Sequence, residues 1–386
     1  MYNFTLYMTT DCNFRCKYCY EDYKNHYHLT EKKLIESINF IMNYGDRGKI
    51  TLEFLGGEPL LKKELIYQAV EYINANFSDR KVKYYITTNC SLLDNEFIEF
   101  MRKNEFTVRL SFDGNKETHN LNRIDKSGFS CYENILKNVL NVKKSGLHYS
   151  VRMTITQNTI PYMFENIRFI HSQGLNNICM IMDVYLDLTD NLYKIFEEQV
   201  EMIVEYYIKS FDEGNKIILD QIDGKLLNFL CDFGNCFAMC NAGIDNFKIM
   251  PDGNIFPCSF LTNDQQFSIG NIYEGVRGEK ARELSLSYFD KYNRKCVGCH
   301  IRDFCHGMKC GYMNFIRTGK INVPTETECL CEKVFYRAMV KIIEHYLELP
   351  RNGIEQWLGK YILYIKKSGL ILSEYGIKVE NRLQDE

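Results

Sequence analysis

The sequence has little net charge and no long run of apolar residues. Its 47 lysines and arginines against 50 aspartates and glutamates leave a formal charge of −3, which gives no electrostatic basis for binding duplex nucleic acid or an anionic membrane. No stretch approaches the roughly 18 apolar residues of a transmembrane helix. Residues 1–10 lack the basic start and apolar core of a secretory signal. These absences predict a cytoplasmic globular protein without a nucleic-acid or membrane partner, and the length of 386 residues suggests two to three domains.

Cysteine is the residue that the sequence has in excess. Sixteen cysteines in a chain of this size, with no secretory signal, indicate metal or redox chemistry rather than a disulfide framework. Most of them cluster, whereas cysteines that only fill a core should scatter. The clusters are Cys12, Cys16 and Cys19; Cys236, Cys240 and Cys258; and Cys296, Cys299, Cys305, Cys310, Cys329 and Cys331.

The first half of the chain alternates short β runs with helical stretches, which predicts an α/β fold with a parallel sheet. Strands are expected at residues 2–10, 50–55, 82–87, 107–111, 149–155 and 178–185. Helices are expected at 31–44, with Thr30 as N-cap, and at 64–76, 95–103, 133–145, 164–173 and 191–211. Six such units form a partial (β/α)6 TIM barrel, closed or open, with the active site at the carboxyl ends of the strands.

After about residue 220 the alternation stops and cysteines and short glycine-containing turns appear. We therefore expect a barrel at 1–230, a metal-stapled domain at 231–335 and a helical tail at 336–386. In that tail region, apolar residues recur at helical spacing over residues 332–349, up to Pro350.

The first cysteine group follows the first expected strand directly, with the spacing C-x3-C-x2-C. Thiolates at such short intervals are typical iron–sulfur ligands, and three of them leave one iron of a 4Fe–4S cluster open to a small molecule. A zinc site is the alternative. It normally requires a fourth protein ligand, for which His26 and His28 are the nearby candidates.

This triplet resembles the signature of radical SAM enzymes, and further segments extend the resemblance. Gly56-Gly57-Glu58-Pro59 resembles the segment that meets the amino group of S-adenosylmethionine. Thr88-Asn89 resembles a T-N-G turn in which Cys90 replaces the glycine, and residues 119–123 (HNLNR) resemble a segment of one branch of the family. The resemblance implies that the cofactor-binding residues are Tyr18, Gly56, Gly57, Glu58, Asn89, Ser111, Asp113 and Arg152.

The chemistry that the resemblance implies is radical formation. Cys12, Cys16 and Cys19 would hold a 4Fe–4S cluster whose fourth iron binds S-adenosylmethionine. One electron, from reduced flavodoxin or ferredoxin, would cleave the sulfonium to methionine and a 5′-deoxyadenosyl radical that abstracts a substrate hydrogen. The alternative from another class is an iron–sulfur electron-transfer or sensor protein that binds the cofactor without catalysis.

The carboxyl-terminal cysteines resemble the SPASM extension, which holds auxiliary clusters. The fit includes Gly253, but the last interval, between Cys305 and Cys310, is one residue longer than in the family pattern. The resemblance implies two auxiliary 4Fe–4S clusters. A zinc ribbon at Cys296, Cys299, Cys305 and Cys310 is the rival reading. The implied ligands are Cys236 (or its competitor Cys231), Cys240, Cys258 and Cys310 for one cluster, and Cys296, Cys299, Cys305 and Cys331, preferred over Cys329, for the other.

SPASM enzymes mostly modify peptides or proteins, and two subclasses resemble this sequence. Anaerobic sulfatase maturases oxidise a Ser or Cys to formylglycine, and carry an acidic residue where Ser259 stands here. Because a neutral hydroxyl is a poor base, we expect instead a maturase of ribosomally made, Cys-rich precursor peptides that forms thioethers or other crosslinks. Asp223 or another carboxylate could substitute for the acid. Cys90 could contact substrate or be a small residue in place of glycine. The precursor would be recognised by the barrel, the second domain, the tail or a separate leader-binding protein, since the triplet begins close to residue 1.

Overall fold

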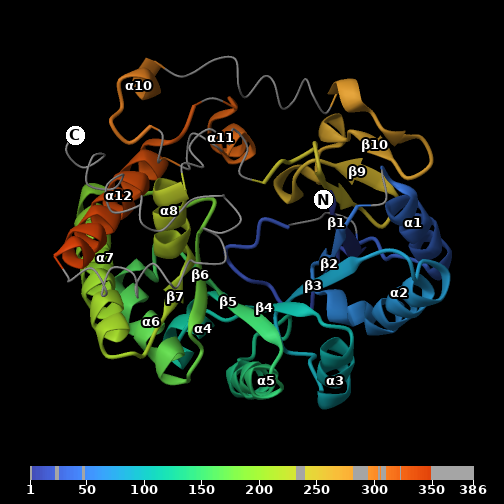
Figure 1. The fold of residues 1–386 in the computed structure, drawn as a ribbon, viewed down its shortest axis with the longest axis horizontal. Coiled ribbons are helices and arrows are strands. Elements are labelled where there is room, and N and C mark those ends of the chain that lie inside the picture. The colour runs from blue at the N-terminus through green and yellow to red at the C-terminus, as the bar shows by residue number, and fades with distance from the viewer. Residues whose placement is uncertain are drawn as a thin grey trace.

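The computed structural model describes residues 2–21, 26–45, 48–231, 240–280, 294–302, 305, 310–321 and 323–348. Within them a single 11-stranded sheet runs through the protein, in the order β11-β10-β9-β8-β1-β2-β3-β4-β5-β6-β7. Figure 1 shows the sheet curving around a central space, with helices along its outer side.

The six expected strands are confirmed, and each pairs in parallel with the next along the chain. The last of them ends three residues earlier than expected, because the Asp183 N–H bonds back to the Ile155 carbonyl at 2.8 Å as the chain turns away. The strands are β1 Tyr2–Thr9, β2 Ile50–Gly56, β3 Val82–Thr88, β4 Thr107–Ser111, β5 His148–Ile155 and β6 Asn177–Met182.

Amphipathic helices follow the strands and cover the outer face of the sheet (Figure 1). The Thr30 side chain accepts a hydrogen bond from the Lys33 N–H and caps the first of them, as the sequence predicts. These helices are α1 Glu31–Asn43, α2 Lys63–Asn76, α3 Asn95–Lys103, α5 Tyr132–Lys144, α6 Met163–Ser172 and α7 Asp190–Asp212, and a short α4 spans Lys116–Asn122. Single 3₁₀ turns lie at Pro59–Lys62, Ile160–Tyr162, Ser259–Leu261 and Gln265–Phe267.

The two faces of the sheet differ in chemistry. On the outer face, Phe4 of β1 packs edge-on against Phe40 of α1 and against Tyr44, which follows α1. On the inner face, polar side chains from neighbouring strands meet: Thr5 of β1 and Thr87 of β3 both donate to the carboxylate of Glu53 on β2. This alternation follows from the two-residue period of a strand and places polar groups inside the barrel.

The second half of the chain extends the barrel sheet, which the sequence did not indicate. Strand β8 (Asn246–Ile249) pairs in parallel with β1, and β9 (Asn254–Phe256), β10 (Gly270–Asn271) and β11 (Gly275–Val276) follow antiparallel. At the opposite edge β7 (Ile218–Leu219) pairs with β6. Among the described residues β1 and β6 do not pair with each other, so the barrel is open.

Four helices complete the described structure: α8 Asp220–Cys231, α10 Arg294–Val297, α11 Gly311–Thr318 and α12 Glu326–Leu347. Helix α12 begins six residues before the expected start, at a capping box in which Thr325 and Glu328 exchange side-chain and backbone hydrogen bonds. It runs through position 335, where we expected the second domain to end, and packs against α7 and α8 (Figure 1). No helix among the described residues is long and apolar enough to span a bilayer.

Candidate functional site

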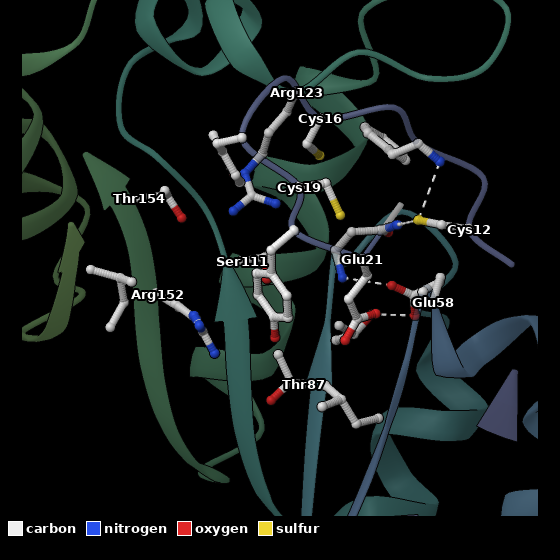
Figure 2. A pocket seen from close by; sticks show the side chains of 18 of the residues that line it. Cys12, Cys16, Cys19, Glu21, Glu58, Thr87, Ser111, Arg123, Arg152 and Thr154 are labelled. Atoms are coloured by element: carbon white, nitrogen blue, oxygen red, sulfur yellow. Dashed lines mark hydrogen bonds between the residues drawn. The ribbon is translucent and has the colours of Figure 1, made fainter. Parts of the chain in front are cut away.

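The cysteine triplet lies in the loop after β1 and lines a pocket at the carboxyl ends of the strands. Cys12, Cys16 and Cys19 contribute to this wall together with Gly57 and Glu58 from the end of β2. Figure 2 shows the three cysteines along one side of the pocket, with Arg152 entering from another. The pocket encloses about 910 Å³, part of it open to solvent. The strands thus bring the triplet and the distant motifs to one edge of the sheet, as predicted.

Backbone contacts between the ends of β1 and β2 hold the triplet loop against the Gly-Gly segment. The Gly57 N–H donates to the Thr9 carbonyl at 3.0 Å and the Glu58 N–H to the Asp11 carbonyl at 2.9 Å. A Cβ on Gly57 would lie 2.3 Å from the Asp11 oxygen and 3.0 Å from the Cys12 Cβ. Only glycine allows so close an approach, which explains why this residue type precedes Glu58.

The carboxylate of Glu58 ties β2 to β3. It accepts hydrogen bonds from the Leu60 N–H at 3.1 Å, the Thr88 hydroxyl at 2.8 Å and the Asn89 N–H at 2.7 Å. Burial raises the pKa of Glu58 to about 7, against the lowering effect of these three donors. The Glu58 side chain therefore holds the ends of β2 and β3 together at the pocket wall, while its backbone N–H bonds to the triplet loop.

Asn89 links the T-N turn to the triplet. Its side-chain amide donates to Asn13 Oδ1 at 2.8 Å and points at the Cys12 sulfur at 3.8 Å. The next residue, Cys90, adopts φ 67°, the left-handed conformation that glycine takes most readily. Cys90 is fully buried in the hydrophobic core and does not line the pocket, so its side chain replaces a glycine rather than facing a substrate.

A buried ion pair stands beside the triplet, and sequence reasoning did not assign it a role. Arg123 donates from Nε and Nη2 to the two oxygens of Asp113, at 2.8 and 3.1 Å. The Tyr18 hydroxyl donates to the same carboxylate at 2.8 Å, and the guanidinium lies 5.3 Å from the Tyr18 ring centre. Arg123 directly follows α4 and is the last residue of the HNLNR segment. The resemblance of this segment to one in the family was the only sequence signal that pointed to Arg123.

Residues at the end of this segment and directly after it form backbone hydrogen bonds with the triplet loop. The Arg15 N–H donates to the Ile124 carbonyl at 2.8 Å and the Lys17 N–H to the Asn122 carbonyl at 3.0 Å. His119 Nδ1 accepts from the Asp113 N–H at 3.3 Å. Burial lowers the pKa of His119 to about 4, so the imidazole is neutral near pH 7.

Seven of the eight residues predicted to bind the cofactor line the pocket, and Asp113 does not. The Asp113 carboxylate is occupied by Arg123, Tyr18 and the Thr154 N–H at 2.9 Å. Sequence reasoning did not identify Glu21, a lining residue that accepts a 3.0 Å hydrogen bond from the Tyr7 hydroxyl. Burial raises the pKa of Glu21 to about 7.

The donor set at the pocket suits an iron–sulfur cluster. Burial raises the pKa of the Cys12 thiol to about 12, so formation of its thiolate requires compensation by bound metal. Among the described residues, no three His, Cys, Asp or Glu side chains converge tightly enough for one metal ion. Cys12, Cys16 and Cys19 are the residues that would hold a cluster here.

A second pocket adjoins the first and shares residues Ile181–Val184 of its wall. Cys310 and Cys331 both line it, as do Glu328 and Glu332 of α12. The buried Lys225 ammonium donates to both oxygens of Glu332, at 2.8 and 2.7 Å. This pocket brings the carboxyl-terminal cysteines to the open side of the barrel.

The carboxyl-terminal cysteines form two neighbourhoods. Burial raises the pKa of Cys310 to about 12, and the nearby thiols of Cys258 and Cys240 add to the effect. Burial also raises the pKa of Cys329, with contributions from Cys296 and Cys299. Cys236 lies outside the described residues, Cys231 ends α8, and the Cys305 N–H bonds to the Ile301 carbonyl at 2.8 Å. Grouping Cys310 with Cys240 and Cys258 differs from a ribbon built on residues 296–310.

Asp223 does not line either pocket. Its carboxylate accepts from the Tyr207 hydroxyl at 2.8 Å and from the Leu219 N–H at 2.6 Å, so it stabilises the start of α8. The structure therefore gives Asp223 a role at the start of α8.

Comparison with known proteins bears on what this pocket holds. Residues 6–170 match the family model of the radical SAM superfamily. This protein contains a radical SAM domain. A cysteine-type anaerobic sulfatase-maturating enzyme of Clostridium perfringens (strain 13 / Type A) is 25% identical to it over 320 residues, covering 78% of this chain and 86% of that protein. The radical SAM cyclopropyl synthase TigE of Paramaledivibacter caminithermalis is 23% identical over 381 residues, covering 91% and 76%.

Solved structures give the same fold for this protein. The enzyme anSMEcpe with bound AdoMet superposes with a TM-score of 0.77 at 21% identity, covering 92% of this chain and 98% of that chain. Streptococcus suis SuiB bound to its precursor peptide SuiA superposes with a TM-score of 0.61 at 16% identity, covering 85% and 75%. The superfamily implies a 4Fe–4S cluster and S-adenosylmethionine.

Proposed function

We propose that this radical SAM enzyme modifies a cysteine-containing peptide made by the ribosome. The observation that carries the proposal is the pairing of the two adjoining pockets, one lined by the cysteine triplet and the other by Cys310 and Cys331. Structural relatives were solved with peptides: anSMEcpe with the Kp18Cys peptide, and SuiB with the precursor peptide SuiA.

In this proposal Cys12, Cys16 and Cys19 hold the reactive cluster, which supplies, with S-adenosylmethionine, the radical that takes a hydrogen from the substrate. The chain's own residues bind and orient. Arg152 offers a cation to the carboxylate of the cofactor, and Ser111 and Asn89 offer hydrogen bonds from neighbouring strand ends. Apolar side chains from β6 and from the second region, Ile181, Met182 and Phe260, line the same pocket and limit access of water.

Auxiliary 4Fe–4S clusters complete the proposal. One would be held by Cys240, Cys258 and Cys310, with Cys236 or Cys231 as the fourth ligand. The other would be held by Cys296, Cys299 and Cys305, with Cys331 as the ligand that the SPASM resemblance implies. The first neighbourhood of the structure supports the first ligand set, since Cys310 lies near Cys240 and Cys258 although the sequence places it after Cys305.

Two substrates are compatible with this arrangement. The identity to cysteine-type sulfatase-maturating enzymes favours oxidation of a sulfatase cysteine to formylglycine. Ser259 in place of an acidic residue, together with the position of Asp223 away from both pockets, favours crosslinking of a Cys-rich precursor peptide. We prefer the second because a serine hydroxyl cannot take up the proton released in the first reaction.

The test is anaerobic reconstitution with iron and sulfide, followed by dithionite and S-adenosylmethionine. Formation of 5′-deoxyadenosine is expected, and its absence under these conditions contradicts catalysis. Mass spectrometry of candidate peptides separates the substrates: crosslinking removes two hydrogens and consumes a thiol, whereas maturation converts one cysteine to an aldehyde that reacts with hydrazines. The matched control is the Cys16→Ala enzyme, which should yield neither product.

A further inference from the structure

A row of hydrogen bonds runs along the inner face of the sheet from the first pocket to the second region. It begins at Thr87, which lines the pocket and donates to Glu53 Oε1 at 2.9 Å. Thr5 donates to Glu53 Oε2 at 3.2 Å, and the Lys248 ammonium donates to the Thr5 hydroxyl at 3.0 Å. Strand pairing sets this contact, because Thr5 of β1 lies opposite Lys248 of β8.

The row ends at the cysteines of the second region. Lys248 also donates to Asn246 Oδ1 at 2.8 Å, and the Asn246 amide in turn donates to the Cys240 carbonyl at 3.0 Å. Both residues lie on β8, two positions apart, so they point to the same face of the sheet. Lys248 is therefore held in place by two hydrogen bonds, one of them to Asn246, which itself contacts the backbone of Cys240.

The charges along this row do not balance. Glu53 already forms an ion pair with Arg109, whose guanidinium carries the same sign as Lys248. Burial lowers the pKa of Lys248, whereas the nearby Glu53, Cys258 and Cys240 act to raise it and Arg109 lowers it further. Within the part of the chain that the structure describes, one carboxylate thus faces two cations, and Lys248 lies near the thiols of Cys258 and Cys240. A partly buried charge normally has a partner, and an anionic cluster on these thiolates would supply one.

We infer that Lys248 is a positioning residue whose fixed positive charge raises the reduction potential of an iron–sulfur cluster held by Cys240, Cys258 and Cys310. This inference rests on the proposed function, because the cluster is part of that proposal. Adding one electron to such a cluster makes its net charge more negative, and a nearby cation stabilises the reduced form. A more positive potential makes the cluster a better acceptor for an electron withdrawn from an oxidised substrate.

The experiment is a redox titration of the reconstituted full-length enzyme, followed by electron paramagnetic resonance. The variant lacking Cys12, Cys16 and Cys19 identifies which signals are auxiliary. In Lys248→Met we expect the ratio of reduced to oxidised auxiliary cluster to fall about tenfold at the wild-type midpoint, a shift of about 59 mV to more negative potential for one electron. Lys248→Arg keeps the charge and should retain most of the wild-type potential. The exposed Lys83 on β3 provides the matched control, Lys83→Met, which should leave it unchanged.

Three results would overturn the inference. An unchanged potential in Lys248→Met would show that the Lys248 charge does not raise the potential of the cluster. The auxiliary clusters and the proposed function would still stand. Equal shifts in the Met and Arg variants show that packing, not charge, sets the potential. Iron near four atoms per chain, with no auxiliary signal, removes the clusters themselves and therefore both the inference and that part of the proposed function.

Discussion

Arg123 and Asp113 form a bidentate ion pair in which both side chains are almost fully buried, beside the loop that carries the cysteine triplet. Neither residue is adjacent to a cysteine in the sequence. The pair orients the Tyr18 hydroxyl and so connects the strand-four motif to the triplet.

Replacing Asp113 by Asn should destabilise the protein strongly, because the Arg123 cation would remain buried without a counter-charge. Breaking a buried pair in this way costs about 3–5 kcal/mol. Urea unfolding of the anaerobically purified enzyme measures the change. The exposed pair of Lys116 and Glu133 is the control, since Lys116→Gln should change stability by less than about 1 kcal/mol. Similar losses of stability in both variants would show that the buried Asp113–Arg123 pair contributes no more than an exposed one.

The neutral state of His119 should make stability depend on pH. Burial lowers the pKa of His119 to about 4, whereas an exposed histidine titrates near 6.5. The unfolded chain therefore gains this proton first as the pH falls, and stability is lost between about pH 6.5 and pH 4, by about 3 kcal/mol at most. Urea unfolding across this range should show a shallower slope for His119→Asn than for the wild type. The exposed His148 supplies the control variant, which should keep the wild-type slope.

Cys90→Gly should leave formation of 5′-deoxyadenosine unchanged, because the Cys90 side chain lies in the core and not in the pocket. Glycine also relieves a left-handed backbone conformation that costs about 1 kcal/mol or more for other residues. Cleavage of S-adenosylmethionine is followed by liquid chromatography. A complete loss of turnover in a folded, iron-loaded Cys90→Gly enzyme would restore the catalytic role for this thiol.

Arg152→Met should weaken cofactor binding by about 10- to 100-fold, the value of a lost hydrogen bond to a charged group. Arg152 lines the pocket from β5, on the strand next to Ser111. Isothermal titration of the cluster-loaded enzyme with S-adenosylmethionine measures the affinity. The control is Arg168→Gln on the exposed side of α6, which should bind normally. Unaltered affinity in Arg152→Met would exclude the carboxylate contact.

Cys329 and Cys331 should differ in their effect on iron content. They lie two residues apart on α12 and therefore project to different sides of the helix. The SPASM resemblance assigns Cys331 as a ligand, so Cys331→Ala should lose one cluster, about four irons per chain, while Cys329→Ala keeps it. Cys329 lies near Cys296 and Cys299, which favours Cys329 as the ligand instead. Loss of iron only in Cys329→Ala would reverse the assignment.

Local sequence determined the elements of the barrel and the cysteine triplet. Period-two and helical patterns, with caps such as Thr30, are local properties, and the expected strands and helices agree with the structure to within a few residues. The carboxyl ends of parallel strands meet at one edge, so motifs after β1, β2, β3 and β4 could be placed together from their order alone. The family match over residues 6–170 confirms the resemblance to the radical SAM superfamily.

Tertiary structure alone decided the rest, because it depends on contacts between residues far apart in the chain. Nothing in the sequence of Asn246–Ile249 indicates that this strand pairs with β1, and that pairing is what brings Lys248 into the barrel. Likewise Asp113 was expected at the cofactor but faces Arg123, and Asp223 was offered as a base but stabilises α8. The role of a carboxylate is set by the hydrogen-bond donors that surround it after folding. In the same way, the 16 cysteines predict metal chemistry, while the packing of neighbouring residues sets the electrostatic environment of the site.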